Sequence, residues 1–151
     1  MKRHPSLHPL SHDHHHGLVQ ARRFARSAGA SHEAMRKQIE AFLQFARQSL
    51  TVHFRDEEQI LLPALEPYLD TASDAQCQRL LQEHRQLWEQ IDALEGALSD
   101  GNFHAEMMLD VANRLEKHIR FEERELFPRI EKVLPEEALE SLGARLRPQQ
   151  D

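Results

Sequence analysis

Apolar residues recur at spacings of three and four along most of the chain, which is the period of helices that bury one face. The first predicted helix spans about residues 11–28, with Ser11 as its N-terminal cap. The second spans about residues 31–61, and Pro63 and Pro67 are expected to kink or end it.

The second half of the chain predicts two further long helices and a short one. Ser73–Gln76 has the pattern of a capping box that opens the third helix. A turn at Gly101 separates it from a fourth helix over about residues 103–133, and a short helix over 136–142 is closed by Gly143. Because long helices joined by short links pack side by side, the predicted fold is all-α: an antiparallel up-down-up-down four-helix bundle with a short C-terminal helix.

The composition supports one globular domain. Of 151 residues, 40% are hydrophobic and 29% are charged, and helix-favouring Leu, Ala, Glu, Gln and Arg dominate. We expect residues 1–10 to be a flexible lead-in, residues 11–146 to form the bundle, and residues 147–151 to be a tail. The one cysteine, Cys77, excludes an internal disulfide framework.

Charge and hydropathy exclude several classes of partner. The net charge of −6 provides no basic patch for a nucleic acid, and no stretch has the apolar length of a membrane span. The first residues lack the apolar core of a signal peptide. We therefore expect a cytoplasmic protein that binds neither nucleic acid nor membrane.

Histidine is the residue type that stands out, with 11 in the chain, and some of these lie in an internal repeat. The segment from His53 to Glu66 matches the segment from His118 to Glu131 at the His, Arg, Glu-Glu, Leu, Pro and final Glu positions. Residues four apart stack on one helix face, so each repeat presents a His and a Glu together. The pairs are His53 with Glu57 and His118 with Glu122.

Both pairs share a face with apolar residues, where an ionised carboxylate is costly unless a cation or a partner neutralises it. Two such pairs that converge from two helices would form a site of nitrogen and oxygen ligands, which suits iron, manganese or zinc. A single His-x-x-x-Glu is more often a surface ion pair, and a duplicated plain helix is the alternative explanation of the repeat.

Histidines on the other two helices would complete such a site. His84 has apolar neighbours three and four residues away on both sides, so it is expected to point into the bundle. The first helix contains His12 and the run from His14 to His16, of which one or two can face the core. Periodicity slightly favours His14, because Leu18 and Ala21 follow it on the same face.

Together these motifs resemble the hemerythrin-like family, also called the HHE cation-binding domain. The resemblance implies two iron ions with an oxo or hydroxo bridge at the centre of the bundle, although zinc or manganese is possible. Because His15 lies in a His-x-Gly-Leu motif similar to that of hemerythrins, the resemblance favours it over His14. The implied metal ligands are His15, His53, Glu57, His84, His118 and Glu122, with His14 and Glu123 as alternatives.

The sequence departs from oxygen-carrying hemerythrins at two positions. Trp88 stands where they have a second histidine on the third helix, and their fourth-helix carboxylate corresponds to Glu123 rather than Glu122. The loss of one histidine argues against reversible oxygen carriage. It favours a protein that binds or senses dioxygen, peroxide or nitric oxide, with a small diatomic ligand or peroxide as its partner.

Three other functions remain compatible with the sequence. The same centre could serve a peroxidase-like enzyme, although no acid–base pair outside the ligand set indicates a substrate pocket, so a binding protein is favoured over an enzyme. The chain could be a helical interaction module without metal. A subset of the ligands could hold a single zinc ion, which usually takes four ligands.

Overall fold

Helices make up nearly all of residues 2–146, the part of the chain that this computed structural model describes, and no strand occurs in that part. The helical elements, in chain order, are η1 (Pro5–Leu7), α1 (His8–Ser27), α2 (His32–Phe45), η2 (Ala46–Leu50), α3 (Thr51–Asp56), η3 (Glu57–Leu61), α4 (Leu62–Leu65), α5 (Ala75–Asp100), α6 (Ala105–Phe121), η4 (Glu122–Leu126), α7 (Phe127–Val133) and α8 (Glu136–Leu146). Here η1 is a 3₁₀ turn, and η2, η3 and η4 are π-helical. Within the described residues, no helix is both long and apolar enough to cross a membrane.

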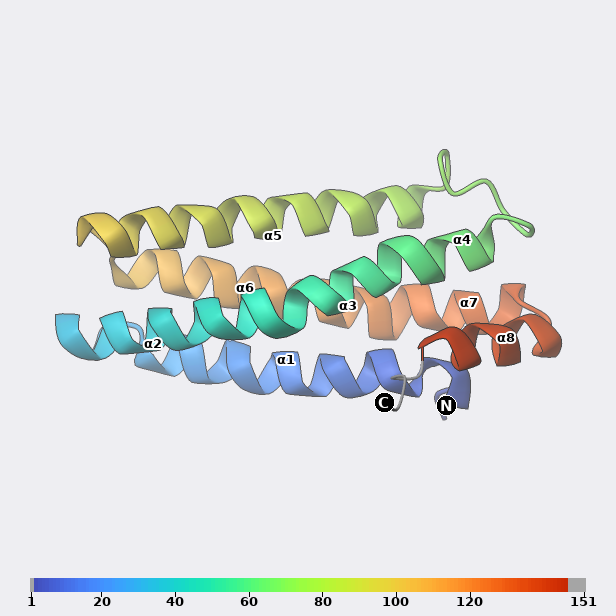
Figure 1. The fold of residues 1–151 in the computed structure, drawn as a ribbon, viewed down its shortest axis with the longest axis horizontal. Helices are drawn as coiled ribbons and strands as arrows, with labels where there is room; N and C mark the ends of the chain where they lie inside the picture. The colour runs from blue at the N-terminus through green and yellow to red at the C-terminus, as the bar shows by residue number, and fades with distance from the viewer. Residues whose placement is uncertain (1, 147–151) are drawn as a thin grey trace.

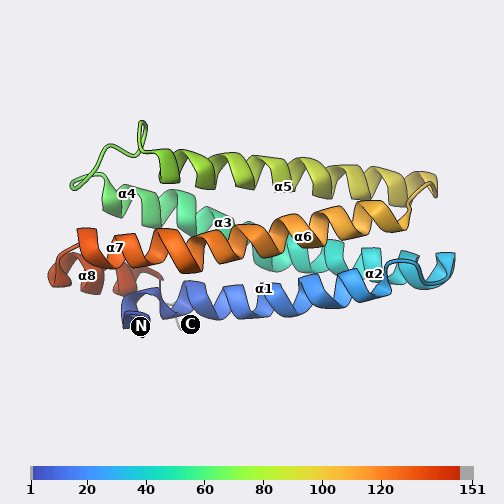
Figure 2. The same cartoon turned by 180° about the vertical axis from the view of Figure 1, so that it is seen from behind.

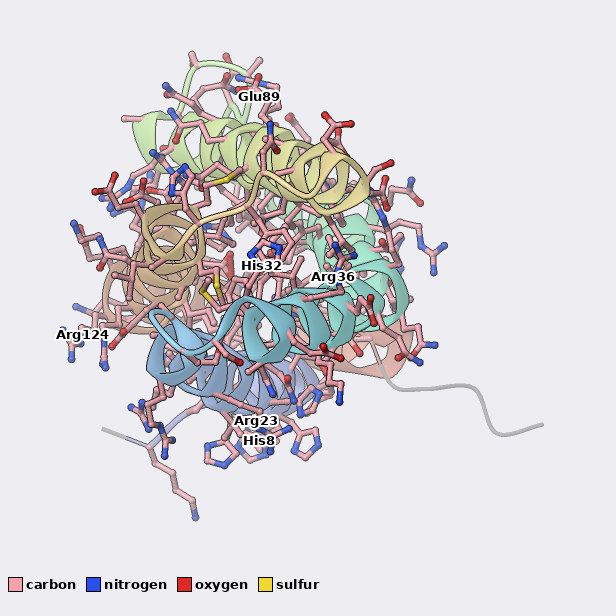
Figure 3. All side chains as sticks on the ribbon, turned by 90° about the vertical axis from the view of Figure 1, so that its left-hand side faces the viewer. His8, Arg23, His32, Arg36, Glu89 and Arg124 are labelled. Carbon is pink, nitrogen blue, oxygen red and sulfur yellow. The ribbon has the colours of Figure 1, made fainter. Side chains whose placement is uncertain are left out.

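The long helices lie side by side along the length of the molecule (Figure 1). The elements from α2 to α4 follow one another without a break, and α6, η4 and α7 form another continuous path, visible from behind in Figure 2. α1 packs against α2 and α6, and α5 packs against the same two helices. In the end-on view of Figure 3, the two helices that carry the sequence repeat therefore lie across a diagonal of the bundle.

The links between helices follow local sequence signals. The Ser31 side chain accepts a hydrogen bond from the Ala34 amide at the start of α2, as an N-cap does. Asp74 accepts from the Cys77 amide and caps α5, one residue later than the predicted box. Gly101 ends α5 with a φ of 76°, a left-handed conformation that glycine adopts without steric cost.

A π-helical turn begins at the carboxylate of each repeat. η3 starts at Glu57 and η4 starts at Glu122, and each is soon followed by a proline, Pro63 or Pro128. π turns are rare and frequently occur at functional sites. The wider turn places the proline, which lacks an amide proton, where the helix can continue past it. Pro63 therefore does not end its helix, which runs to Leu65.

Both ends of the described chain are more helical than the sequence indicated. α1 begins at His8 rather than at Ser11, and Leu7 and Leu10, expected in a loose lead-in, are buried. α8 continues to Leu146, with Gly143 inside it rather than at its end. A Cβ atom at Gly143 would lie 2.9 Å from the Cα of Ser6, so this glycine permits close packing of two backbones. The predicted tail, residues 147–151, lies outside the described residues.

The apolar core is divided into two clusters along the bundle. One contains Phe24, Phe42 and Ile91, and the other contains Leu7, Phe127 and Leu142. Between them, each long helix contributes buried polar side chains. Apart from Ser6, the buried polar residues of the described chain are His14, His53, Glu57, His84, His118 and Glu122.

Candidate metal centre

Six imidazole and carboxylate side chains meet in the middle of the bundle, at exposures of 4% or less. Their ligand atoms form two groups, and within each group the atoms lie within 4.8 Å of one another. The first group comprises His14, His53, Glu57 and Glu122, and the second comprises Glu57, His84, His118 and Glu122. The two glutamates therefore belong to both groups.

Each shared carboxylate directs its two oxygens at different histidines. Oε2 of Glu57 lies 3.3 Å from Nε2 of His53, whereas Oε1 lies 3.0 Å from Nε2 of His84. Oε1 of Glu122 lies 2.8 Å from Nε2 of His14, and Oε2 lies 2.8 Å from Nε2 of His118. Each glutamate therefore offers one oxygen to each of the two groups, and each group contains two histidines.

Several of these buried atoms have no hydrogen-bond partner. They are Nε2 of His53, Oε2 of Glu57, Nε2 of His118 and Oε2 of Glu122. His118 and Glu122 are close, but their relative direction does not fit a hydrogen bond. An unsatisfied buried polar group costs about 1–3 kcal/mol, so a centre with four of them calls for a further partner. A cation at each group would satisfy all four, and the residues therefore fit a pair of metal ions.

In every histidine of the centre, the second ring nitrogen, Nδ1, lies within hydrogen-bond distance of a carboxylate. Nδ1 of His14 lies 2.5 Å from Glu123, and Nδ1 of His84 lies 2.7 Å from Glu58. Nδ1 of His53 lies 3.0 Å from Asp13, and Nδ1 of His118 lies 2.7 Å from Glu83. An Nδ1–H that donates to a carboxylate leaves Nε2 with a free lone pair toward the centre, which is the state that a metal ligand needs.

These outer carboxylates follow a pattern that the sequence contains but that periodicity did not single out. In each Glu-Glu pair the first residue faces the centre, and the second, Glu58 or Glu123, accepts from a histidine on a different helix. Asp13 and Glu83 each directly precede a centre histidine and accept from the histidine of a repeat. Of these four residues only Glu123 was a candidate, and it was considered as a ligand.

The histidine on α1 that reaches the centre is His14. It is 3% exposed and belongs to the first group, whereas His15 lies on the exposed side of α1. The expectation of His15, which rested on the motif resemblance, was wrong in position. The helical period, with Leu18 and Ala21 on the same face, slightly favours His14, and in the structure His14 is buried on the side of α1 that also buries Gly17 and Ala21. Glu123 lies outside both groups.

Neighbouring charges within the centre strongly shift the pKa values of its histidines and of Glu122. Burial, the largest influence, by itself lowers the pKa of His118, but the Glu122 and Glu83 carboxylates outweigh it and raise that pKa to about 10. The pKa values of His14, His53 and His84 are raised in the same way by the acidic residues around them. Burial by itself raises the pKa of Glu122, yet His118 and His14 hold it well below its usual range. The buried charges thus require positive counterparts, either protons or cations.

One wall of the centre is aromatic. The ring of Phe54 stacks on His84 with centroids 3.9 Å apart, and Trp88 packs edge-on against Phe54 at 5.6 Å. Trp88 thus stands one turn after His84 but behind Phe54, and it supplies no ligand atom to either group. Phe54 thus covers the imidazole of His84, one of the residues of the second group, and Trp88 packs against Phe54.

Comparison with known proteins agrees with this geometry. The model of one family, described as the hemerythrin HHE cation binding domain, matches residues 9–130. No curated protein and no solved structure gives a significant match to the chain. The matched stretch contains all six buried residues of the centre.

Proposed function

This chain belongs to the hemerythrin HHE cation-binding domain family, and we propose that it is a non-haem di-iron protein that binds or senses dioxygen, peroxide or nitric oxide. The observation that carries the proposal is that Glu57 and Glu122 are each shared between two histidine pairs. A single cation would leave one pair, and one oxygen of each carboxylate, without a partner.

The ligand set suits iron at both positions. Each position is offered two imidazole nitrogens and one oxygen from each of the two glutamates. Imidazole together with carboxylate suits iron, and a set of four protein ligands would leave room at each position for a further small ligand. When bound, two irons would supply redox chemistry and open positions for a small exogenous ligand.

The chain itself provides orientation and exclusion of water. Four carboxylates accept hydrogen bonds from the Nδ1–H groups and so fix the direction of the imidazoles. They belong to Asp13, Glu58, Glu83 and Glu123. Phe54 and the two apolar clusters pack around the centre. An apolar surrounding of this kind favours small neutral ligands such as dioxygen and nitric oxide over large polar substrates.

The proposal is tested by elemental analysis of the purified protein together with its near-ultraviolet and visible spectrum. Two irons per chain with oxo-to-iron charge-transfer bands, and a spectral change on exposure to nitric oxide or peroxide, would support it. A single zinc, or no metal and no band after anaerobic loading with iron, would overturn it. Catalytic turnover of peroxide with loss of reductant would instead assign the same centre to a peroxidase-like enzyme.

A further inference from the structure

The exposed side of α1 carries histidines that the centre does not use. His8, His12 and His16 follow one another at intervals of four residues, so they lie on successive turns of one exposed helix face. Figure 3 shows the labelled His8 at the outer side of α1, away from the middle of the bundle. His14 occupies the opposite face of the same helix, in the centre.

Two of these histidines border a cavity that reaches toward the centre. The cavity has a volume of about 290 Å³, and its lining residues are His12, Asp13, His16, Phe45, Ser49, Leu50 and His53. His12 and His16 are exposed, whereas His53 is 4% exposed. The cavity therefore extends from two surface imidazoles to the buried imidazole of His53, which belongs to the first group of the centre.

The mouth of this cavity has the chemistry of a metal site. His12 and His16 are one turn apart, so both imidazoles can bind the same ion, and neither makes a side-chain hydrogen bond within the described residues. Asp13, next to them, is half exposed and offers an oxygen that His53 does not engage, because only Oδ2 contacts Nδ1 of His53. Neutral imidazole suits divalent nickel, copper, zinc and iron.

We propose that His12 and His16 form a surface site for a divalent transition-metal ion, and that ions pass from this site through the cavity to His53 and the buried centre. The surface site stands on its own geometry. The passage to the centre rests on the proposed function. Asp13 connects the two, since it lines the same cavity as His12 and His16 and its carboxylate accepts from Nδ1 of His53.

The surface site is tested by calorimetric titration of the protein as isolated, with Ni²⁺ as the only added metal. The double variant His12→Ala with His16→Ala is compared with the double variant His15→Ala with His104→Ala, which also removes two exposed histidines. We expect the wild type and the His15/His104 variant to bind one Ni²⁺ more than the His12/His16 variant. Equal Ni²⁺ binding by all three proteins, or the same loss in both variants, would overturn the site.

The passage of ions is tested by the rate at which apo-protein takes up Fe²⁺ without oxygen. We expect the His12/His16 variant to reach the same final iron content several-fold more slowly, because it lacks the imidazoles that would hold Fe²⁺ at the mouth of the cavity. An unchanged rate would overturn the passage and leave the surface site standing. If neither the wild type nor the variants take up iron, both the di-iron proposal and the passage fail. The Ni²⁺ titration still decides the surface site. Thermal unfolding of both variants checks that the bundle is intact.

Discussion

Glu58 and His84 lie on different helices, and the glutamate Oε2 accepts from Nδ1 of the histidine at 2.7 Å. The second repeat contains the equivalent contact, in which Glu123 accepts from His14. The centre is therefore pseudosymmetric: each Glu-Glu pair offers one carboxylate to the interior and one to a histidine of a neighbouring helix. This explains why two consecutive glutamates occur in both repeats, when only the first of each faces the centre.

Replacement of Glu58 tests its role as a positioning residue. We expect Glu58→Ala to weaken metal binding by about 10- to 100-fold without abolishing it, because outer carboxylates orient their imidazoles and raise their basicity. Glu58→Gln retains an amide oxygen that can accept from Nδ1–H, so its effect should be smaller. Competition with a chelator measures the affinities. Glu89→Ala, an exposed residue of α5, is the matched control and should leave the affinity unchanged.

Neighbouring histidines of α1 should differ sharply on replacement. His14→Ala removes an Nε2 that lies 2.8 Å from Glu122, and we expect it to lower the metal content at the position that His14 forms with His53. His15→Ala removes only an exposed side chain and should leave the metal content and spectrum intact. Elemental analysis of both purified variants decides between them, and a loss of metal in His15→Ala alone would contradict the assignment of His14.

Rising pH should lower the stability of the apo-protein and raise the affinity of the centre for metal ions. The pKa of His118 is raised from 6.5 to about 10 in the fold. A raised folded pKa contributes stability that is complete below the unfolded pKa and lost as the pH rises through the folded value. We therefore expect the free energy of unfolding of the apo-protein to fall between pH 6.5 and about 10. Metal affinity should rise over the same window, because a cation must displace these protons.

Urea denaturation at several pH values, with and without a chelator, measures both trends. An apo-protein whose stability is constant across that window would contradict the raised pKa of the centre histidines. The His118→Ala variant provides the control, since it should show a smaller dependence on pH.

Asp74 stabilises the start of α5 in two ways. It caps the helix at the Cys77 amide, and its carboxylate pairs with Arg129 of α7 at 2.6 Å. We expect Asp74→Ala to destabilise the fold by about 1 kcal/mol more than Asp74→Asn, because asparagine still caps but cannot form the ion pair. Chemical denaturation at neutral pH measures this difference.

The pH dependence of the same contact has a definite sign. The Arg129 guanidinium holds the pKa of Asp74 below its usual range. A lowered folded pKa contributes stability that is present above the unfolded value of 3.8 and is lost as the pH falls through the folded value. The advantage of the wild type over Asp74→Asn should therefore shrink in acid, and an advantage that grows in acid would contradict the ion pair.

Two glycines should respond to alanine with opposite signs. A Cβ at Gly143 would lie 2.9 Å from the Ser6 backbone, so we expect Gly143→Ala to destabilise the fold by about 1–3 kcal/mol, the usual cost of overpacking. A Cβ at Gly96 would have no atom within 4 Å, so Gly96→Ala should stabilise α5 by about 0.5–1 kcal/mol. Thermal unfolding of both variants tests the close packing of α8 on the N-terminal turn.

The sequence by itself determined the helices and the paired motifs, because both depend on spacings within one segment. His53 shares a helix face with Glu57, and His118 shares one with Glu122, because residues four apart lie one turn apart on a helix. The burial of His84 followed from its apolar neighbours in the same way. Helix ends were less certain, as the late start predicted for α1 and the early end predicted for α8 show.

Only the tertiary structure decided which side chains meet across helices. The rotation of α1 against its neighbours places His14 rather than His15 in the centre, and a rotation of one residue along a helix is about 100°, enough to exchange a buried ligand for an exposed one. The pairing of Asp13 with His53, and the contact of Gly143 with Ser6, likewise join residues far apart in the chain. Such contacts depend on the relative positions of packed helices, which no spacing within one helix specifies.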